Sequence, residues 1–264
     1  MLACPLDLQP LARADRVWRC SANHSYDEAR EGYVNLLPPG RPSRKNAGDD
    51  KASVEARRRF LSGGHYEILA ARLGEITGSL TPNAVLDVGC GEGYYTGWLR
   101  APEIAGVDIS HAGIRLAARA HPSIAFAVGN AAALPVVTAS ADVAVSVFAP
   151  VDPEEFARVV APGGHAVVAV PGAHHLAAIR SLLYVTPQPH DEALPELGAR
   201  FELVDTQRLA GEIAVDEDAR RDLLTMTPYR FAVPPEALER ALRHEGPTTT
   251  PISFLVARFR RHSD

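Results

Sequence analysis

The stretch VLDVGCGEGYYTGWL, residues 85–99, decides the fold of this 264-residue chain. An apolar run ends at Gly89, and Gly91 and Gly93 follow at alternate positions. Glycine is needed where a backbone turns tightly and where a ligand approaches backbone amides with no Cβ in the way. The stretch therefore predicts a buried strand, then a loop that cradles a ligand, then a helix over residues 93–100.

Short apolar runs alternate with helical patterns in the chain that follows. Continuous apolar strands, unlike alternating ones, indicate a parallel sheet covered on both faces. We therefore expect an α/β fold with a doubly wound, mostly parallel sheet. The expected strands are residues 84–89, 104–108, 124–129, 141–148 and 164–171, and the expected later helices are residues 110–121 and 153–161.

Both flanks of this core have patterns of their own. Residues 52–80 show helical spacing that is interrupted at Gly63 and Gly64, which predicts two helices joined by a glycine turn. Residues 200–209 and 252–261 alternate and are longer, which predicts a closing antiparallel pair of strands at the sheet edge. Residues 216–231, between these two strands, are expected to form a helix.

The N-terminal end has the spacing of a small metal-binding knuckle. Two residues separate Cys4 from Asp7, twelve separate Asp7 from Cys20, and three separate Cys20 from His24, which suits a structural zinc site. Carboxylate oxygen is a harder ligand than thiolate and contributes less affinity for zinc. We expect Zn²⁺ to bind weakly with Asp7 as the fourth ligand; the alternative is a knuckle held by packing of Trp18 and Tyr26.

Composition separates this module from the rest of the chain. Residues 38–50 are rich in Pro, Gly and charge, so we expect a zinc-ribbon-like domain at 1–37, a linker and helices at 38–83, and the main domain at 84–264. The net charge is −5, yet residues 1–66 hold eleven Arg and Lys against eight Asp and Glu. A basic end suits contact with a polyanion, and a solvated surface is the alternative.

Other classes of protein are excluded by simple counts. Three cysteines argue against a disulfide framework, and Cys90 in the glycine loop is interpreted as a packing residue. The sequence contains no apolar run of eighteen residues and no basic leader, so neither a membrane span nor a signal peptide is expected. We therefore expect a cytoplasmic protein.

The spacing of the glycines indicates which ligand the loop holds. The third glycine comes one residue earlier than in the dinucleotide fingerprint, and Asp87 leads the motif. Asp108, after the second strand, can accept hydrogen bonds from ribose hydroxyls, and Asn130 can contact an adenine edge. The arrangement resembles the S-adenosylmethionine loop of doubly wound methyltransferases. Another nucleotide remains an alternative, and a purely structural glycine turn would not require Asp108.

The sequence VFAP, residues 147–150, ends the fourth strand, where open α/β sheets bind ligands. Phe148 and Pro150 are therefore expected to form the wall of a methyl-acceptor pocket. A buried aromatic side chain followed by a turn proline is the alternative.

Several further blocks carry a more specific resemblance. In order along the chain they are EGYVNLLP (31–38), ARRRFLSGGHY (56–66), LDVGCGEGYYT (86–96), FAP (148–150), VPGAHHL (170–176) and MTPYRF (226–231). With the knuckle, they resemble the 23S rRNA guanine-N1 methyltransferases, a family that includes macrolide-resistance enzymes. The resemblance covers nearly the whole chain, although the family's knuckle has a third Cys at the position of Asp7.

This resemblance implies a class I, Rossmann-like enzyme that methylates N1 of a guanine in a 23S rRNA hairpin near the exit tunnel. It also implies a zinc ribbon that recognises RNA, a working homodimer, and a link to antibiotic resistance. At the matching positions Tyr66, Gly91, Glu92 and His175 would contact the cofactor. From the residues alone, Tyr66 and His175 are equally well explained as structural side chains.

Arginines in two segments are candidates for contact with RNA. Arg57, Arg58 and Arg59 on the expected helix, with Arg41, Arg44 and Lys45 in the linker, are placed to meet phosphates; an ordinary solvated helix face is the alternative. The sequence also leaves two other functions open. These are methylation of a small natural-product acceptor on the same scaffold, and cofactor binding without transferase activity.

Overall fold

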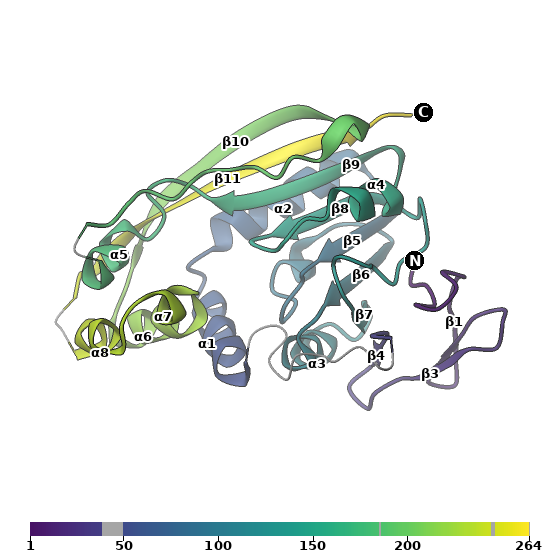
Figure 1. Ribbon diagram of the computed structural model, residues 1–264, viewed down its shortest axis with the longest axis horizontal. Coiled ribbons are helices and arrows are strands. Elements are labelled where there is room, and N and C mark those ends of the chain that lie inside the picture. Colours follow the sequence, from purple (N-terminus) through teal and green to yellow (C-terminus); the bar gives the residue numbers. More distant parts are fainter. Residues whose placement is uncertain (39–49, 185, 244–245, 264) are drawn as a thin grey trace.

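The computed structural model describes residues 1–38, 50–184, 186–243 and 246–263. At its centre lies an eight-stranded sheet with the order β10-β11-β9-β8-β5-β6-β7-β4 (Figure 1). The six strands from β9 to β4 run parallel, whereas β11 pairs antiparallel with both β9 and β10. The bounds are β4 (Tyr33–Asn35), β5 (Ala84–Val88), β6 (Glu103–Asp108), β7 (Ala125–Val128), β8 (Ala141–Val147), β9 (Val160–Pro171), β10 (Phe201–Ala214) and β11 (Thr249–Arg261).

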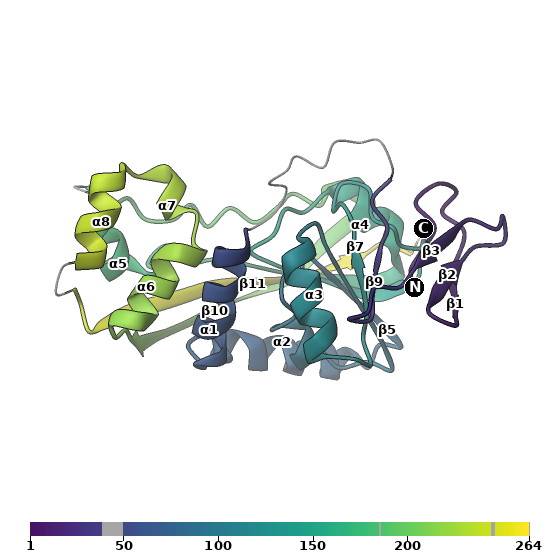
Figure 2. The same ribbon diagram turned by 90° about the horizontal axis from the view of Figure 1, so that it is seen from below.

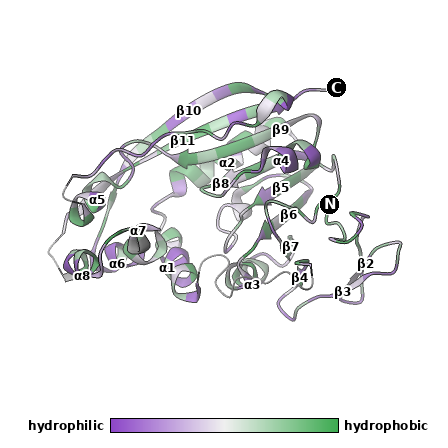
Figure 3. Cartoon of the chain, viewed as in Figure 1, coloured by the Kyte–Doolittle hydropathy of each residue, from purple (hydrophilic) through white to green (hydrophobic). Residues whose placement is uncertain are grey.

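The predicted mostly parallel sheet and its closing antiparallel pair are thus confirmed, and both faces of the sheet are covered. In β5, Val85 packs into one apolar cluster with Leu73, whereas the next residue, Leu86, packs into a second cluster with Phe156. The helices that contribute these partners, α2 (Glu67–Leu80) and α4 (Pro153–Val159), lie on opposite sides of the sheet in Figure 2. Figure 3 shows apolar colour along β8 and β9, as expected for strands buried on both faces.

The remaining helices flank the sheet or form a lobe beside it. The glycine turn predicted at Gly63 and Gly64 joins α1 to α2, and α3 follows β6 as predicted. The lobe lies at the left of Figure 1, at the end of the sheet toward which β9 points. The bounds are α1 (Lys51–Ser62), α3 (His111–Ala120), α5 (Ala177–Leu183), α6 (Glu217–Met226), α7 (Tyr229–Ala232), α8 (Pro235–Arg243) and the 3₁₀ turns η1 (Thr96–Trp98) and η2 (Gly198–Arg200).

Two helix predictions were wrong in their extent. The helix expected over residues 93–100 is only the short turn η1, because Gly97 lets the His121 ring approach to 2.5 Å from the place of a Cβ. Glycine in a helix interior also carries an entropic cost. The helix expected over residues 216–231 is divided into α6 and α7, and Pro228 lies at the break.

The N-terminal module is a three-stranded sheet of β1 (Ala12–Ala14), β2 (Val17–Arg19) and β3 (Ser25–Asp27). It does not stand apart from the rest of the chain. Leu2 and Cys20 belong to the same apolar cluster as Leu86, and β4 adds to the main sheet parallel to β7. Of the predicted linker, residues 39–49 lie outside the described residues, and so do Arg41, Arg44 and Lys45.

The helices in the described part of the chain are all too short or too polar to cross a membrane.

Candidate functional site

The glycine loop between β5 and η1 has a backbone that few other residues tolerate. Gly89, Gly91 and Gly93 have φ angles of +76°, +56° and +84°, in the left-handed region. A Cβ on Gly89 would lie 2.3 Å from Cβ of Ala149, and one on Gly93 would lie 2.9 Å from Cβ of Ala117. The loop is therefore pressed against the chain after β8 on one side and against α3 on the other.

Asp87 connects the two ends of this loop. It is buried in β5, and Oγ1 of Thr96 donates a hydrogen bond of 2.6 Å to its carboxylate. Burial raises the pKa of Asp87 to about 7; the nearby Asp108 and Glu92 add to this rise, whereas the bond from Thr96 opposes it. Asp87 therefore ties η1 to β5, and Glu92 is itself buried in the loop.

Asp108 ends β6 directly beside the loop. Its two carboxylate oxygens accept the backbone N–H of Gly91 at 2.9 Å and of Ser110 at 2.7 Å. A carboxylate at this position, after the second strand of the parallel sheet, is the kind of group that accepts hydrogen bonds from ribose hydroxyls. Asn130 lies after β7, and its Oδ1 accepts the N–H of Ala132 at 3.0 Å. Its NH₂ group is then the part that can meet an acceptor on an adenine edge.

Tyr66 and His175, which are 109 positions apart, form a buried pair: the Tyr66 hydroxyl lies 2.9 Å from Nε2 of His175. Nδ1 of His175 accepts the N–H of Ser253 at 3.3 Å, so the hydrogen-bond network assigns the ring proton to Nε2. Burial lowers the pKa of His175 to about 3, with the nearby His190 and Arg180 adding to the effect. The imidazole is therefore neutral and donates to Tyr66.

Phe148, at the carboxyl end of β8, is held in an unusual conformation. Its φ is +55°, and its side chain is 41% exposed. The alternative of a buried aromatic is therefore wrong. The ring centroid lies 6.4 Å from those of Tyr66 and Tyr95, and 5.8 Å from that of Phe254. A non-glycine residue with φ in this region is strained, and strained residues cluster at functional sites. Pro150 follows it and is exposed.

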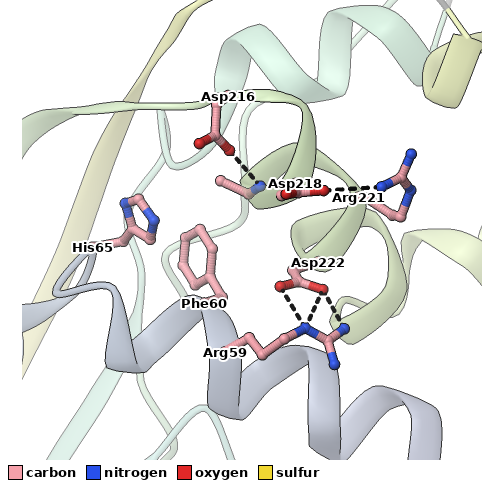
Figure 4. Close-up of a pocket in the computed structure, with 8 residues that line it drawn as sticks. Arg59, Phe60, His65, Asp216, Asp218, Arg221 and Asp222 are labelled. Atoms are coloured by element: carbon pink, nitrogen blue, oxygen red, sulfur yellow. Dashed lines mark hydrogen bonds and ion pairs between the residues drawn. The ribbon is translucent and has the colours of Figure 1, made fainter.

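The three arginines of α1 do not share one environment. Arg59 forms an ion pair with Asp222 of α6, with an N–O distance of 2.5 Å (Figure 4), in a pocket of about 520 Å³ between the two helices. Arg58 is exposed. Nη1 of Arg57 lies 3.9 Å from the place of a Cβ on Gly91, and its Nη2 donates to the carbonyl of Met226 at 3.3 Å.

Arg57 therefore lies over the glycine loop, a position that sequence reasoning missed, as it missed Tyr95. Tyr95 is near the loop along the chain, and Arg57 reaches the loop from α1. Neither residue, however, belongs to a spacing that marks a ligand contact.

The N-terminal module brings Cys4, Asp7, Cys20 and His24 together. Nδ1 of His24 lies 3.4 Å from each cysteine sulfur and 3.1 Å from Oδ2 of Asp7, and the sulfur of Cys20 lies 3.4 Å from the same oxygen. Ligands of a tetrahedral zinc ion, at bond lengths of roughly 2.0–2.3 Å, are about 3.3–3.7 Å apart. The four side chains therefore fit a zinc ion, with the carboxylate in place of a thiolate.

The alternative, packing of Trp18 and Tyr26, concerns the side chains around the same cluster. Tyr26 and Trp18 pack against the module's buried side chains, and the Tyr26 hydroxyl lies 3.1 Å from the Cys4 sulfur. Hydroxyl groups around a metal centre commonly orient its ligands in this way. Packing and metal binding are therefore compatible here.

Comparison with protein families and curated proteins finds matches to two parts of the chain and to nearly its whole length. Residues 2–42 match a zinc-ribbon model described as RlmA, N-terminal, and residues 85–164 match a model described as methyltransferase domain. The chain is 34% identical to the 23S rRNA (guanine(748)-N(1))-methyltransferase of Streptomyces fradiae, over 97% of this chain and 96% of that protein. A Micromonospora griseorubida protein named for 23S rRNA (guanine-N(1)-)-methyltransferase activity is 32% identical over 98% and 97% of the two chains.

Among solved structures, the YcgJ protein of Bacillus subtilis aligns with a TM-score of 0.51 and 17% identity. The alignment covers 73% of this chain and 98% of that one. At this identity the likeness concerns the fold alone.

Proposed function

The chain belongs to the family of 23S rRNA (guanine-N1)-methyltransferases, and from this membership we propose that it transfers a methyl group from S-adenosylmethionine to N1 of a guanine in 23S rRNA. The observation that carries the proposal is a likeness extending from the zinc ribbon to the C-terminal strands, so that the N-terminal module and the main sheet match the same relative together. As in the sequence-based expectation, the acceptor is a guanine in a hairpin near the exit tunnel.

The glycine loop and its neighbours form the cofactor site in this proposal. S-adenosylmethionine supplies an activated methyl group on a sulfonium. Asp108 holds the ribose hydroxyls and Asn130 the adenine edge. The backbone of Gly89, Gly91 and Gly93 allows close approach. Further cofactor contacts come from Glu92, Tyr66 and His175, whose buried positions fix their orientation, while Asp87 shapes the loop.

Phe148 and Pro150 form the acceptor side. Guanine N1 is paired inside a duplex, so the base must come from a loop or be flipped outward. An exposed aromatic ring at the strand end offers a stacking surface for such a base. The transfer itself then depends on alignment and on the exclusion of water, for which the ring cluster of Tyr66, Phe148 and Phe254 is suited.

Zinc bound to Cys4, Asp7, Cys20 and His24 would fix the loops of the N-terminal module, which we propose contacts the RNA. Metal analysis of protein purified without chelator tests this. About one equivalent of zinc is expected, and less than about a tenth of an equivalent would contradict it. Asp7→Cys should bind zinc at least about tenfold more tightly in competition with a chromophoric chelator, since thiolate is the softer ligand.

We also propose a homodimer as the working form. Two apolar side chains, Leu203 and Val204, are exposed at a β-bulge of the mostly polar edge strand β10, and their burial against a second copy would remove apolar surface from water. Sedimentation equilibrium of the wild type and of Leu203→Lys measures how far the substitution weakens the dimer. A wild-type protein that is monomeric at micromolar concentration would contradict the proposal.

Methyl transfer is tested with S-adenosylmethionine labelled in the methyl group and unmodified 23S rRNA or its hairpin fragments. Label in the RNA is expected, together with a stop in primer extension at one guanine, because an N1-methyl group blocks base pairing. Asp108→Ala is the control, since it removes the ribose contact and should abolish the label. Wild-type protein that binds the cofactor but leaves every fragment unlabelled would overturn the assignment of the acceptor.

A further inference from the structure

The hydroxyl of Tyr95 is buried and has no hydrogen-bond partner among the described residues. Tyr95 follows the glycine loop, and its ring meets those of Tyr94 and Phe148 edge-on, at centroid distances of 5.1 and 6.4 Å. Burial raises the pKa of the Tyr95 hydroxyl well above its usual value, so the group stays protonated and is a donor. A buried donor with no partner is costly, and such a group in a binding site indicates a ligand that accepts its proton.

A positive charge lies over the same loop. Arg57 reaches from α1 over Gly91, where its Nη1 is 3.9 Å from the place of a Cβ, and the carbonyl of Met226 anchors its other nitrogen. Arg57 opposes the rise in the pKa of Tyr95, whereas Tyr66 and Glu92 add to it. A cation (Arg57), a neutral donor (Tyr95) and a carboxylate (Glu92) therefore lie around the glycine loop, close enough to influence one another electrostatically.

This set of groups matches one end of the proposed cofactor. Its nucleoside end belongs at Asp108 and Asn130, after β6 and β7, and the methyl acceptor belongs at Phe148, after β8. The amino-acid end is zwitterionic, and its carboxylate is the one anionic group of the molecule. An anion of this kind calls for a guanidinium and a hydrogen-bond donor, with a carboxylate near its ammonium group.

We propose that Arg57 and Tyr95 bind the carboxylate of the methionine portion of S-adenosylmethionine and so position its methyl group toward Phe148. This assignment rests on the proposed function and deepens it, because it names the residues that recognise the amino-acid end. It also replaces the expectation that Arg57 contacts RNA phosphate. Arg57 and Tyr95 are positioning residues and take no part in proton transfer.

Two ligands that differ only at the amino-acid end provide the test. S-adenosylhomocysteine carries the carboxylate, and 5′-methylthioadenosine lacks the whole amino-acid portion. Calorimetric titration of each into wild type, Arg57→Gln and Tyr95→Phe gives two dissociation constants per protein. We expect each variant to bind S-adenosylhomocysteine roughly 10- to 100-fold more weakly, the effect of a lost charge-assisted hydrogen bond. Binding of 5′-methylthioadenosine should change by less than about twofold.

Arg58→Gln is the matched control, because Arg58 is the exposed neighbour of Arg57 on the same helix. It should leave the binding of both ligands unchanged. Arg57→Lys keeps the charge without the guanidinium fork and should recover part of the loss for S-adenosylhomocysteine.

Equal weakening of both ligands by Arg57→Gln or Tyr95→Phe would overturn the assignment, since a general distortion of the loop does not distinguish them. Unchanged binding of S-adenosylhomocysteine would overturn it as well. A wild-type protein that binds neither ligand would overturn the proposed function and this assignment with it. Weaker binding of S-adenosylhomocysteine with unchanged binding of 5′-methylthioadenosine therefore distinguishes this assignment from the proposed function.

Discussion

Gly89 combines two constraints that can be measured separately. Its φ of +76° lies in the left-handed region, and a Cβ there would lie 2.3 Å from Cβ of Ala149. Gly89→Ala should lower the free energy of unfolding by roughly 2–5 kcal/mol, the sum of backbone strain and overpacking. Gly198 has a φ of +71° with nothing within 4 Å, so Gly198→Ala should lose only about 1–2 kcal/mol.

Urea denaturation of both variants gives the comparison. Equal losses would mean that the contact between the loop and the chain after β8 relaxes without cost. Gly89→Ala should also weaken binding of S-adenosylhomocysteine, whereas Gly198→Ala should not, because Gly198 belongs to η2.

The residues that the sequence predicted are those whose chemistry depends on local spacing. Gly91 and Asp108 stand at fixed offsets from a strand, and the structure brings them into contact. Tyr95 and Arg57 could not be found in this way. Tyr95 stands out because its buried hydroxyl has no partner in the described part of the chain, and Arg57 because its guanidinium reaches Gly91 from α1. Neither property has a sequence pattern.

An ion pair joins α1 to α6, beside the hydrogen bonds that Ser53 and Arg57 donate to carbonyls of α6. Asp222 is buried, and its carboxylate is bound by Arg59, whose side chain is 62% exposed (Figure 4). Arg59→Gln should cost roughly 1–3 kcal/mol of unfolding free energy, mainly because a buried carboxylate loses its charged partner. Arg58→Gln should stay within about 0.5 kcal/mol of wild type. Similar values for the two variants in urea denaturation would contradict this role.

The buried Asp87, which links β5 to η1, should make the free energy of unfolding depend on pH. The pKa of Asp87 is about 7 in the folded protein against an ordinary 3.8, so the folded state binds more protons between these values. The free energy of unfolding should therefore fall as pH rises from about 4 to 7, by up to about 1.4 kcal/mol per pH unit from this group. Asp87→Asn should remove that part of the slope.

Chemical denaturation at several pH values measures this dependence. A wild-type curve with the same slope as that of Asp87→Asn would mean that Asp87 is ionised at no cost. Thr96→Val provides a second check. The bond from Thr96 stabilises the charged carboxylate, and its loss should raise the pKa of Asp87 further and extend the falling region to higher pH.

At the level of helices and strands, the sequence predicted the elements whose periodicity is unbroken. The apolar runs of β5, β6 and β8 lie where expected because they are buried on both faces. The helix expected at η1 was too long because Gly97 disfavours a helix interior. Gly97 packs instead against His121, 24 positions away. Helices α5 and α8 were not predicted, and β9 begins earlier than its apolar run.

At the scale of the whole molecule, the sequence predicted the mostly parallel sheet, because its strands are apolar on both faces. The attachment of the N-terminal module was not predictable in this way. Leu2 and Cys20 share a core with Leu86, and β4 extends the main sheet. These contacts join residues more than sixty positions apart, so no local pattern records them. The module is thus part of the main fold, at the far end from the lobe of α5–α8 (Figure 1).

This placement leads to a prediction about metal removal. The four ligands lie in the loops around β1–β3, whereas the cofactor loop follows β5 at the opposite end of the sheet, toward the lobe. Chelation of zinc should therefore weaken binding to the 23S hairpin by about tenfold or more, because the loops lose their order. Binding of S-adenosylhomocysteine should change by less than about twofold.

Filter binding over a range of salt concentrations separates the possible causes. If the module binds RNA phosphates, chelation should also reduce the steepness with which affinity falls with salt, by about one power of the concentration for each phosphate that the module no longer binds. Arg58→Gln should reduce the steepness by about one without affecting zinc, whereas Arg59→Gln should not, since its guanidinium is bound to Asp222. Loss of S-adenosylhomocysteine binding on chelation would mean that the shared core transmits the disorder to the loop. The module would then act on cofactor binding as well as on RNA.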